Sequence, residues 1–175
     1  KRYNHLLRIA LNKDTISISL RKRYKPKLNL NLKLVSLKRQ KPEFKNLKYK
    51  KILKYLKKVD NSKVDIGLCV NKKIFESGTS NIFFIKNNKI FSPINKFYKG
   101  ITYKFFKTKF KNIINKNILI SSLKEYDEII LIGSGKGVAS VKTIDQIKWK
   151  RKSLKFYNKF SKYYLSAINN YPIYK

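Results

Sequence analysis

Residues 76–85 read Glu-Ser-Gly-Thr-Ser-Asn-Ile-Phe-Phe-Ile, so that a short polar segment runs directly into four apolar residues. By itself, this pattern describes a polar turn between two strands, the second of which is buried. The turn also carries an acidic side chain, Glu76, together with three hydroxyl groups. Whether this turn is structural or part of a binding site therefore depends on the other motifs in the chain.

Two turns further along the chain also combine glycine with a hydroxyl group. Gly100-Ile101-Thr102 stands where a helix is expected to begin, and residues 133–137 read Gly-Ser-Gly-Lys-Gly. The first turn of a helix and a nest of backbone N–H groups both bind anions, because these N–H groups have no partner in the backbone. Two such turns and one acidic residue suit a ligand with a phosphate at one end and a basic nitrogen at the other.

Hydrophobic periodicity predicts a mixed structure around these turns. Apolar and polar residues alternate over residues 5–37, which predicts a three-stranded antiparallel piece with breaks at residues 12–14 and 25–26. Helical spacing predicts helices over residues 47–59, 101–114 and 153–169. The other expected strands cover residues 64–70, 74–75, 82–85, 89–92, 118–121, 128–132 and 138–144, with tight turns at residues 71–73 and 87–88.

In order and spacing, these motifs resemble those of the class IV aminotransferases, a family that includes branched-chain aminotransferases, D-amino-acid aminotransferases and 4-amino-4-deoxychorismate lyases. The resemblance covers residues 39–145. It rests on the segment from Glu76 to Phe83, then on Phe91-Ser92-Pro93, Gly100-Ile101-Thr102, Asp127-Glu128, Gly133-Ser134 and residues 138–145. It implies an α+β fold, that of the fold type IV pyridoxal-phosphate (PLP) enzymes, which are similar to D-amino-acid aminotransferase.

The resemblance also implies a domain organisation. Residues 1–38 would be the tail of a small N-terminal α/β domain, residues 39–42 an interdomain linker and residues 43–175 the cofactor-binding C-terminal domain. The chain begins without methionine, and we expect it to be N-terminally incomplete. In this family the small domain helps to hold the cofactor phosphate and to select the substrate. We therefore expect this chain to hold cofactor poorly, or to be inactive, by itself.

The catalytic lysine of the family lies in a short segment that follows an arginine and a proline, here Arg39 and Pro42. The resemblance therefore places the Schiff-base lysine at Lys45. Tyr49 resembles the family residue that contacts the phenolic oxygen of the cofactor. Such a lysine serves the chemistry because its amine can bond to the cofactor aldehyde and, once displaced by substrate, transfer a proton.

Two nearby lysines, Lys48 and Lys50, compete with Lys45 for this role. Lys48 also stands where the family commonly has an asparagine, a departure that nothing in the sequence explains. The separation of 31 residues between Lys45 and Glu76 resembles the spacing in the family and favours Lys45.

The resemblance assigns roles to the other motif residues as well. Glu76 would lie beside the pyridine nitrogen of the cofactor, where a carboxylate keeps that nitrogen protonated. The phosphate would be held by backbone and hydroxyl groups of Ile101, Thr102, Gly133 and Ser134. The N–H of Gly135 would help to hold a substrate carboxylate, and no metal site is expected.

Within the family, the sequence favours aminodeoxychorismate lyase. Residues 136–138 read Lys-Gly-Val where the lyases often carry Arg-Gly-Val, whereas transaminases more often have an acidic residue there. The lyase would eliminate pyruvate from its amino substrate to give 4-aminobenzoate for folate biosynthesis. The alternative is a branched-chain or D-amino-acid aminotransferase, with 2-oxoglutarate as the usual acceptor. In either case we expect a small-molecule amino substrate and a homodimer with its site near the interface.

The charge of the chain favours a different class of function. Lysine and arginine number 43 against nine acidic residues, a formal net charge of +34. Such a charge suits a nucleic-acid-binding protein without catalysis. Only six of the basic residues are arginine, however, and the lysines are spread along the whole chain. Lys, Asn, Ile, Tyr and Phe are all abundant and share A/T-rich codons. We therefore favour compositional drift, with nucleic acid bound at most through non-specific charge.

The remaining reactive residues indicate no further site. Cys69, the only cysteine, lies in an apolar run and suits a buried thiol in a reducing compartment, which favours the cytoplasm. His5, the only histidine, is not expected to be catalytic. No apolar run approaches the roughly 20 residues of a membrane-spanning helix, so no membrane partner is expected. A hydrophobic fraction of 42% is enough to build a core and argues against wholesale disorder.

Overall fold

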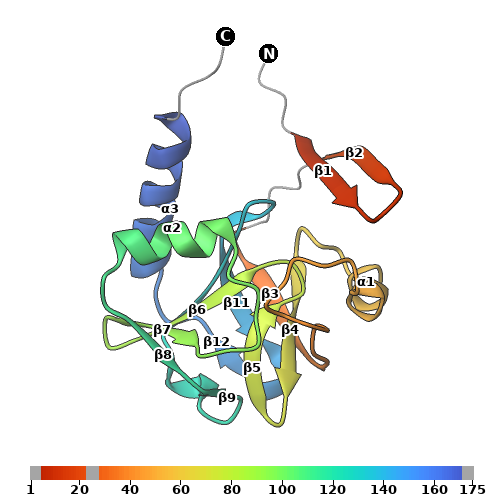
Figure 1. The fold of residues 1–175 in the computed structure, drawn as a ribbon. Coiled ribbons are helices and arrows are strands. Elements are labelled where there is room, and N and C mark those ends of the chain that lie inside the picture. The colour runs from red at the N-terminus through yellow and green to blue at the C-terminus, as the bar shows by residue number, and fades with distance from the viewer. Residues whose placement is uncertain (1–4, 23–27, 171–175) are drawn as a thin grey trace.

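The computed structural model of the chain describes residues 5–22 and 28–170, which form a mixed α/β structure (Figure 1). The helices are α1 (Lys50–Leu56), α2 (Ile101–Lys109) and α3 (Lys155–Asn169), with 3-10 turns η1 (Leu123–Glu125) and η2 (Asp145–Ile147). The strands are β1 (His5–Leu11), β2 (Ile16–Lys22), β3 (Leu30–Ser36), β4 (Val64–Val70), β5 (Lys73–Ser77), β6 (Asn81–Lys86), β7 (Lys89–Pro93), β8 (Ile113–Lys116), β9 (Ile118–Leu119), β10 (Glu128–Gly133), β11 (Gly137–Ile144) and β12 (Trp149–Lys150).

Ten strands form one large sheet in the order β8-β7-β6-β10-β11-β3-β4-β5-β9, and β12 pairs with β11 beside that path. Most pairs are antiparallel, but β3 runs parallel to both β11 and β4, and β7 runs parallel to β8. Strands β1 and β2 form a separate two-stranded sheet. The strands that carry the sequence motifs, β5, β6, β10 and β11, thus all belong to the large sheet.

Strand β10 in the middle of this sheet is buried on both faces. Ile129 and Leu131 belong to one core cluster, whereas Ile130 and Ile132 belong to another. A strand whose two faces both avoid water needs a continuous apolar run instead of an alternating one, which is what residues 129–132 provide. Strand β6 divides its side chains between the same two clusters.

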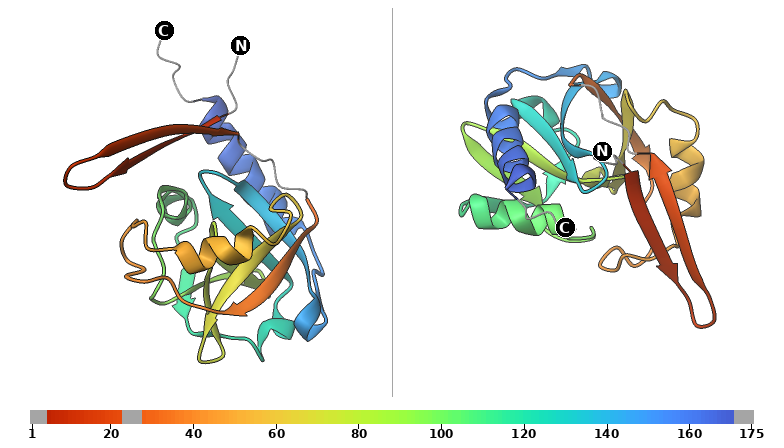
Figure 2. Two further views of the ribbon diagram at one scale, coloured as in Figure 1. Left: turned by 90° about the vertical axis from the view of Figure 1, so that its right-hand side faces the viewer. Right: turned by 90° about the horizontal axis from the view of Figure 1, so that it is seen from above.

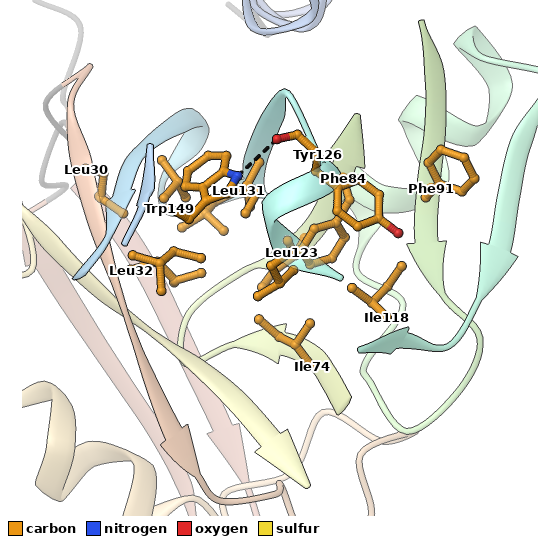
Figure 3. Close-up of a cluster of buried hydrophobic side chains, with 14 of the residues drawn as sticks. Leu30, Leu32, Ile74, Phe84, Phe91, Ile118, Leu123, Tyr126, Leu131 and Trp149 are labelled. Carbon is orange, nitrogen blue, oxygen red and sulfur yellow. Dashed lines mark hydrogen bonds between the residues drawn. The ribbon is translucent and has the colours of Figure 1, made fainter. Parts of the chain in front are cut away.

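The larger cluster lies on the inner face of the sheet (Figure 3). It brings together Phe84 of β6, Ile74 of β5 and Ile118 of β9, although β6 and β9 are far apart in the strand order. Trp149 joins the cluster and donates its indole N–H to the carbonyl of Tyr126 at 3.0 Å, which satisfies the only polar group of the indole. The sheet therefore curls around this core instead of lying flat.

Helices cover the outer face of the sheet. Helices α2 and α3 lie side by side (Figure 1). The ring centroids of Phe106 in α2 and Phe160 in α3 are 4.6 Å apart. Phe160 also packs against Phe83 of β6. Helix α1 covers β3 and β4 through the buried side chains of Ile52 and Leu56. Among the described residues, no helix combines the length and the apolar composition that crossing a membrane requires.

The predicted hairpins around residues 71–73 and 87–88 are confirmed. In both turns, two successive residues have positive φ: Asn71 and Lys72 at 49° and 59°, and Asn87 and Asn88 at 49° and 57°. Two-residue hairpin turns with this backbone match the twist of the strands, and asparagine tolerates the conformation well. The predicted helices over residues 47–59 and 153–169 also exist, as the shorter α1 and as α3.

The predicted helix over residues 101–114 is wrong in its second half. Helix α2 ends at Lys109, and Ile113–Lys116 forms β8 beside β7. The apolar spacing at Phe110, Ile113 and Ile114 fits a helix as well as a strand. Two successive β-branched residues suit an extended backbone, however, and the edge of the sheet is available to them.

The predicted three-stranded antiparallel piece over residues 5–37 is also wrong. Only β1 and β2 pair with each other, whereas β3 enters the large sheet between β11 and β4, where Leu30 and Leu32 are buried. Alternation shows which face of a strand is apolar, but it does not show which strand lies beside it. Residues 25–26, a predicted break, lie outside the described residues. The domain boundaries at residues 38 and 42 stay a prediction.

The β1–β2 hairpin projects from the body of the molecule (Figure 2). Its apolar face consists of directly opposed pairs: Leu7 with Leu20, Ile9 with Ile18, and Leu11 with Ile16. All six side chains are between 57% and 69% exposed. The other face approaches the body at the glycine-rich turn, where a Cβ added to Gly135 would lie 3.3 Å from the side chain of Leu6.

Candidate functional site

Residues 77–80 form a compact turn between β5 and β6 that is organised around the hydroxyl of Ser77. This hydroxyl oxygen accepts hydrogen bonds from the backbone N–H groups of Thr79 and Ser80, at 3.2 and 2.8 Å. The turn packs closely on β4, because a Cβ added to Gly78 would lie only 2.7 Å from the side chain of Ile66. The polar residues of the segment therefore give this turn one fixed shape.

Asn81 connects this turn to the beginning of α2. Its side-chain amide donates to the carbonyl of Tyr98 at 2.6 Å, and its oxygen accepts the N–H of Gly100 at 3.3 Å. No side chain caps the helix, and the N–H groups of a first helical turn have no acceptor within the helix. Among the described residues, no acceptor forms a hydrogen bond with the backbone N–H of Ile101 or Thr102. An anion could accept both.

The glycine-rich turn over residues 133–137 also lies against the β5–β6 turn. Strand β10 runs antiparallel to β6, with Ile132 opposite Asn81, and it ends at Gly133. A Cβ added to Gly133 would lie 3.3 Å from the hydroxyl oxygen of Ser80 and 3.4 Å from the carbonyl oxygen of Thr79. The absence of a side chain thus lets the backbones of the two turns touch. All three motifs singled out in the sequence converge here.

Glu76 lies one residue before the β5–β6 turn and is 3% exposed. Its carboxylate accepts a hydrogen bond from Arg39 Nε at 2.9 Å. Burial raises the pKa of this carboxyl above its usual value, while the charge and hydrogen bond of Arg39 and the backbone N–H of Tyr98 act in the opposite direction. The result is a shielded acidic group beside the beginning of α2.

Lys45 is placed differently from the other predicted site residues. It is exposed on an irregular segment between β3 and α1. Within residues 5–22 and 28–170, no hydrogen bond or ion pair connects Lys45 to Glu76 or to the three turns. The rivals Lys48 and Lys50 are exposed as well. Exposure therefore does not separate the three candidates.

The segment that carries Lys45 nevertheless has a defined conformation. The side-chain amide of Asn46 donates to the carbonyls of Gln40 and Lys41, at 2.9 and 3.1 Å, and its oxygen accepts the N–H of Lys48 at 2.8 Å. Arg39 ties the beginning of the segment to β5 through Glu76. At its end, the half-buried Tyr49 packs against the cluster of apolar side chains under α1.

Two acidic residues with structural partners were missed by the sequence analysis. Asp65 in β4 is fully buried and pairs with Lys136 at 2.9 Å. Glu128 accepts the backbone N–H groups of Phe156 and Tyr157, both at 2.8 Å, and so caps the first turn of α3. A signal did exist for Asp65, since an acidic residue inside an otherwise apolar strand requires a partner.

The sequence of motifs also matches a described family. A sequence model of amino-transferase class IV matches residues 7–144, most of the chain. The chain belongs to the class IV aminotransferase family. This membership confirms the resemblance inferred from the motif order. Class IV aminotransferases depend on PLP. Curated proteins give no match.

Solved structures of the family have the same fold as this class IV chain. The branched-chain aminotransferase of Thermoproteus uzoniensis has a TM-score of 0.73 at 16% identity, over 92% of this chain and 60% of its own. An aminotransferase from Brucella abortus, bound to PLP, scores 0.70 at 17% identity, over 87% and 58%. The 4-amino-4-deoxychorismate lyase of Pseudomonas aeruginosa scores 0.67 at 12% identity, over 92% and 67%. The chain thus spans about three fifths of the first two, and the predicted fold class is confirmed.

The residues of the site fit the two ends of PLP. The open N–H groups at the beginning of α2 and the close approach of Gly133 to Ser80 offer a phosphate several backbone donors. Glu76 offers a buried carboxylate to a pyridine nitrogen. Ser134 is exposed on the turn between β10 and β11, and Gly135 lies against the β1–β2 hairpin. The donor set thus suits the cofactor on which the family depends.

Proposed function

We propose that this class IV family member is a PLP-dependent enzyme in which Lys45 bonds to the cofactor aldehyde and Glu76 binds its pyridine nitrogen. The observation that carries the proposal is the convergence of three motifs. Asn81 bonds to Gly100 at the beginning of α2, and Ser80 lies against Gly133 at the end of β10. Glu76 lies in β5, one residue before the β5–β6 turn that contacts both of the other motifs.

The roles of the acidic and basic groups follow from their surroundings. Bound PLP supplies an electron sink that stabilises negative charge on the substrate. Glu76 keeps the pyridine nitrogen protonated, and the neighbouring Arg39 helps to keep the Glu76 carboxylate ionised despite its burial. Lys45 would bond to the cofactor aldehyde and would carry the proton during the reaction. The Arg39–Glu76 ion pair anchors the beginning of the exposed segment that carries Lys45.

The phosphate end is held by backbone groups. In the proposal, the N–H groups of Ile101 and Thr102 and the Thr102 hydroxyl bind it from one side, and Gly133 and Ser134 bind it from the other. A helix N-terminus favours an anion through both its free N–H groups and its dipole. Tyr49 contacts the phenolic oxygen of the cofactor, and the N–H of Gly135 holds a substrate carboxylate.

For the reaction, we favour 4-amino-4-deoxychorismate lyase, with loss of pyruvate to give 4-aminobenzoate in folate biosynthesis. The Lys136-Gly137-Val138 segment supports this choice, because it resembles the Arg-Gly-Val of the lyases. The alternative, an aminotransferase acting on branched-chain or D-amino acids, is supported by the likeness to the Thermoproteus uzoniensis branched-chain aminotransferase. The proposal includes a small-molecule amino substrate, a cytoplasmic homodimer and the domain division at residues 38 and 42.

Borohydride trapping tests the proposal directly. The chain is incubated with PLP, reduced with borohydride and digested, and the labelled lysine is identified by mass spectrometry. We expect the label at Lys45, its loss in Lys45→Ala, and its retention in the matched variants Lys48→Ala and Lys50→Ala. A label at Lys48 or Lys50 would reject the assignment of Lys45. Labelling spread over many lysines, in the chain and in its full-length form, would reject the family function.

The same preparation separates catalysis from polyanion binding. A protein that acts through its charge binds any nucleic acid tightly, with an affinity that falls steeply as salt rises. The proposed enzyme instead saturates with one PLP per chain at moderate salt. The distinguishing measurement is a titration with PLP and with a random oligonucleotide, each at two salt concentrations.

A further inference from the structure

Asp65 is a fully buried acidic residue to which the proposed reaction gives no role. It lies in β4, and its Oδ1 accepts the backbone N–H of Ile66 at 2.7 Å. Its Oδ2 accepts the hydroxyl groups of Thr79 and Ser77, at 2.6 and 3.1 Å. The carboxylate therefore lies directly beneath the β5–β6 turn, which forms one wall of the proposed phosphate site.

Lys136 reaches the same carboxylate oxygen from the opposite wall. It is the last residue of the β10–β11 turn, yet its side chain is only 9% exposed, because Nζ turns inward and lies 2.9 Å from Asp65 Oδ2. A surface lysine normally extends its amine into water, so inward burial of this one requires a specific partner. The ion pair joins the glycine-rich turn to β4, and the hydroxyl groups that Asp65 accepts extend this link to the β5–β6 turn.

A carboxylate in this position matters for an anionic ligand. A buried negative charge close to a phosphate dianion weakens its binding, because the low polarity of the interior screens the repulsion poorly. Lys136 supplies one positive charge on the oxygen that already accepts two hydroxyl groups. With Lys136 in place, the Asp65–Lys136 ion pair beneath the two turns carries no net charge. Without Lys136, the buried Asp65 carboxylate leaves a net negative charge there.

The geometry points to Lys136 as the residue that makes this site selective for a phosphorylated ligand, by neutralising Asp65 and by holding the β10–β11 turn against the β5–β6 turn. This inference rests on the proposed function, since it takes the two turns as the phosphate site. Lys136 is a positioning residue and does not itself take part in the reaction.

Comparing PLP with pyridoxal, which lacks the phosphate, isolates this effect. The dissociation constants of both are measured by fluorescence titration for the unsubstituted chain, Lys136→Met, Asp65→Asn and the double variant. The matched control is Lys142→Met, which removes an exposed lysine from neighbouring β11. We expect Lys136→Met to weaken PLP about tenfold and leave pyridoxal nearly unchanged. Asp65→Asn should shift the preference towards PLP, and the double variant should bind both ligands nearly as the unsubstituted chain does.

The opposite signs of the two single variants separate this role from a purely structural one. A structural ion pair would weaken both ligands equally in Lys136→Met and in Asp65→Asn, and that result would overturn the inference. If Lys136→Met does not fold, Asp65→Asn and the double variant still decide between the two roles, because neither leaves a buried unpaired carboxylate. If neither the unsubstituted chain nor its full-length form binds either ligand, the proposed function fails, and this inference fails with it.

A second readout needs no cofactor. Inorganic phosphate should raise the thermal unfolding temperature of the unsubstituted chain and of Lys142→Met more than that of Lys136→Met. Equal stabilisation of all three by phosphate would contradict the inference.

Discussion

Arg39 and Glu76 lie 37 residues apart in the chain, yet their side chains form an ion pair of 2.9 Å with the carboxylate almost fully buried. This contact fixes the beginning of the Lys45 segment to the strand that leads into the β5–β6 turn. It also decides the state of Glu76, because burial favours the protonated carboxyl while Arg39 favours the ionised one. Burial prevails, so the pKa of Glu76 lies above its usual value.

Replacing Glu76 with glutamine should stabilise the folded chain above the raised pKa. Because the folded pKa of Glu76 exceeds the unfolded one, its protonated form is favoured on folding, and the stability that it contributes is lost as the pH rises through the folded pKa. We therefore expect Glu76→Gln to exceed the unsubstituted chain in unfolding free energy at neutral pH, and the gap to close as the pH falls below the ordinary pKa of a glutamate. Urea unfolding across this range measures it. The exposed Glu43→Gln is the control, and a less stable Glu76→Gln at neutral pH would contradict the expectation.

Removing Arg39 should have the opposite effect. Arg39→Met leaves the buried Glu76 carboxylate without its ion-pair partner, and we expect a loss of about 3 kcal/mol in unfolding free energy at neutral pH. The pKa of Glu76 should rise further, which NMR titration of its carboxyl group can follow. Most of the loss should be recovered in the double variant Arg39→Met/Glu76→Gln. A double variant as unstable as the single one would show that packing of the arginine, and not its charge, is what matters.

Glu128 should contribute to stability as the cap of α3. Its two carboxylate oxygens accept the N–H groups of Phe156 and Tyr157. Glu128→Ala leaves both donors unpaired and removes a negative charge from the helix N-terminus, which should cost about 2 kcal/mol. Urea unfolding measures the loss, and amide exchange should accelerate first in α3. The control is Glu125→Ala, which removes an exposed ion pair with Lys86 and should have little effect.

We expect the aromatic contact between α2 and α3 to contribute more to the unfolding free energy than any other contact in the core cluster beneath these helices. The fully buried Phe160 contacts Phe83, Phe106 and Phe110. Phe160→Ala should destabilise the chain by about 4 kcal/mol through lost burial and the cavity left behind. On the same helix, Leu165 is 56% exposed, and Leu165→Ala should cost about 0.5 kcal/mol or less. Similar losses for the two variants would show that α3 is not anchored through Phe160.

The apolar face of the β1–β2 hairpin should affect association more than stability. Ile9 and Ile18 are directly opposed and both largely exposed. Replacing both with threonine keeps the β-branched shape that favours strands but removes apolar surface. We expect the unfolding free energy to change by about 0.5 kcal/mol or less, while light scattering falls at high salt, where the net charge of +34 is screened. A large loss of stability would instead mean that this face supports the body of the molecule.

The sequence is sufficient to predict the elements that local chemistry decides. The turns at Asn71 and Asn87 follow from the tolerance of asparagine for positive φ. The convergence of the β5–β6 turn, α2 and the glycine-rich turn was expected from motif order, and the structure brings these three together through Asn81 and Gly133. The roles of these residues towards a cofactor stay a prediction.

Contacts between distant segments were beyond the sequence. The neighbour of β3 was predicted wrongly because alternation specifies a face and not a partner strand. Lys136 and Asp65 lie 71 residues apart, and with so many lysines in the chain no spacing distinguishes the one that turns inward. The place of Lys45 relative to Glu76 depends on an irregular segment, for which periodicity carries no information.

The three buried acidic residues of the described part of the chain decide which substitutions this lysine-rich protein can tolerate. Glu76 pairs with Arg39, Asp65 pairs with Lys136, and Glu128 caps the beginning of α3. An exposed lysine of such a chain can be replaced by another nearby, but a buried carboxylate held by a specific partner cannot. The buried acidic residues are therefore the positions at which substitution should disturb the fold most, although acidic residues are few in a chain of net charge +34.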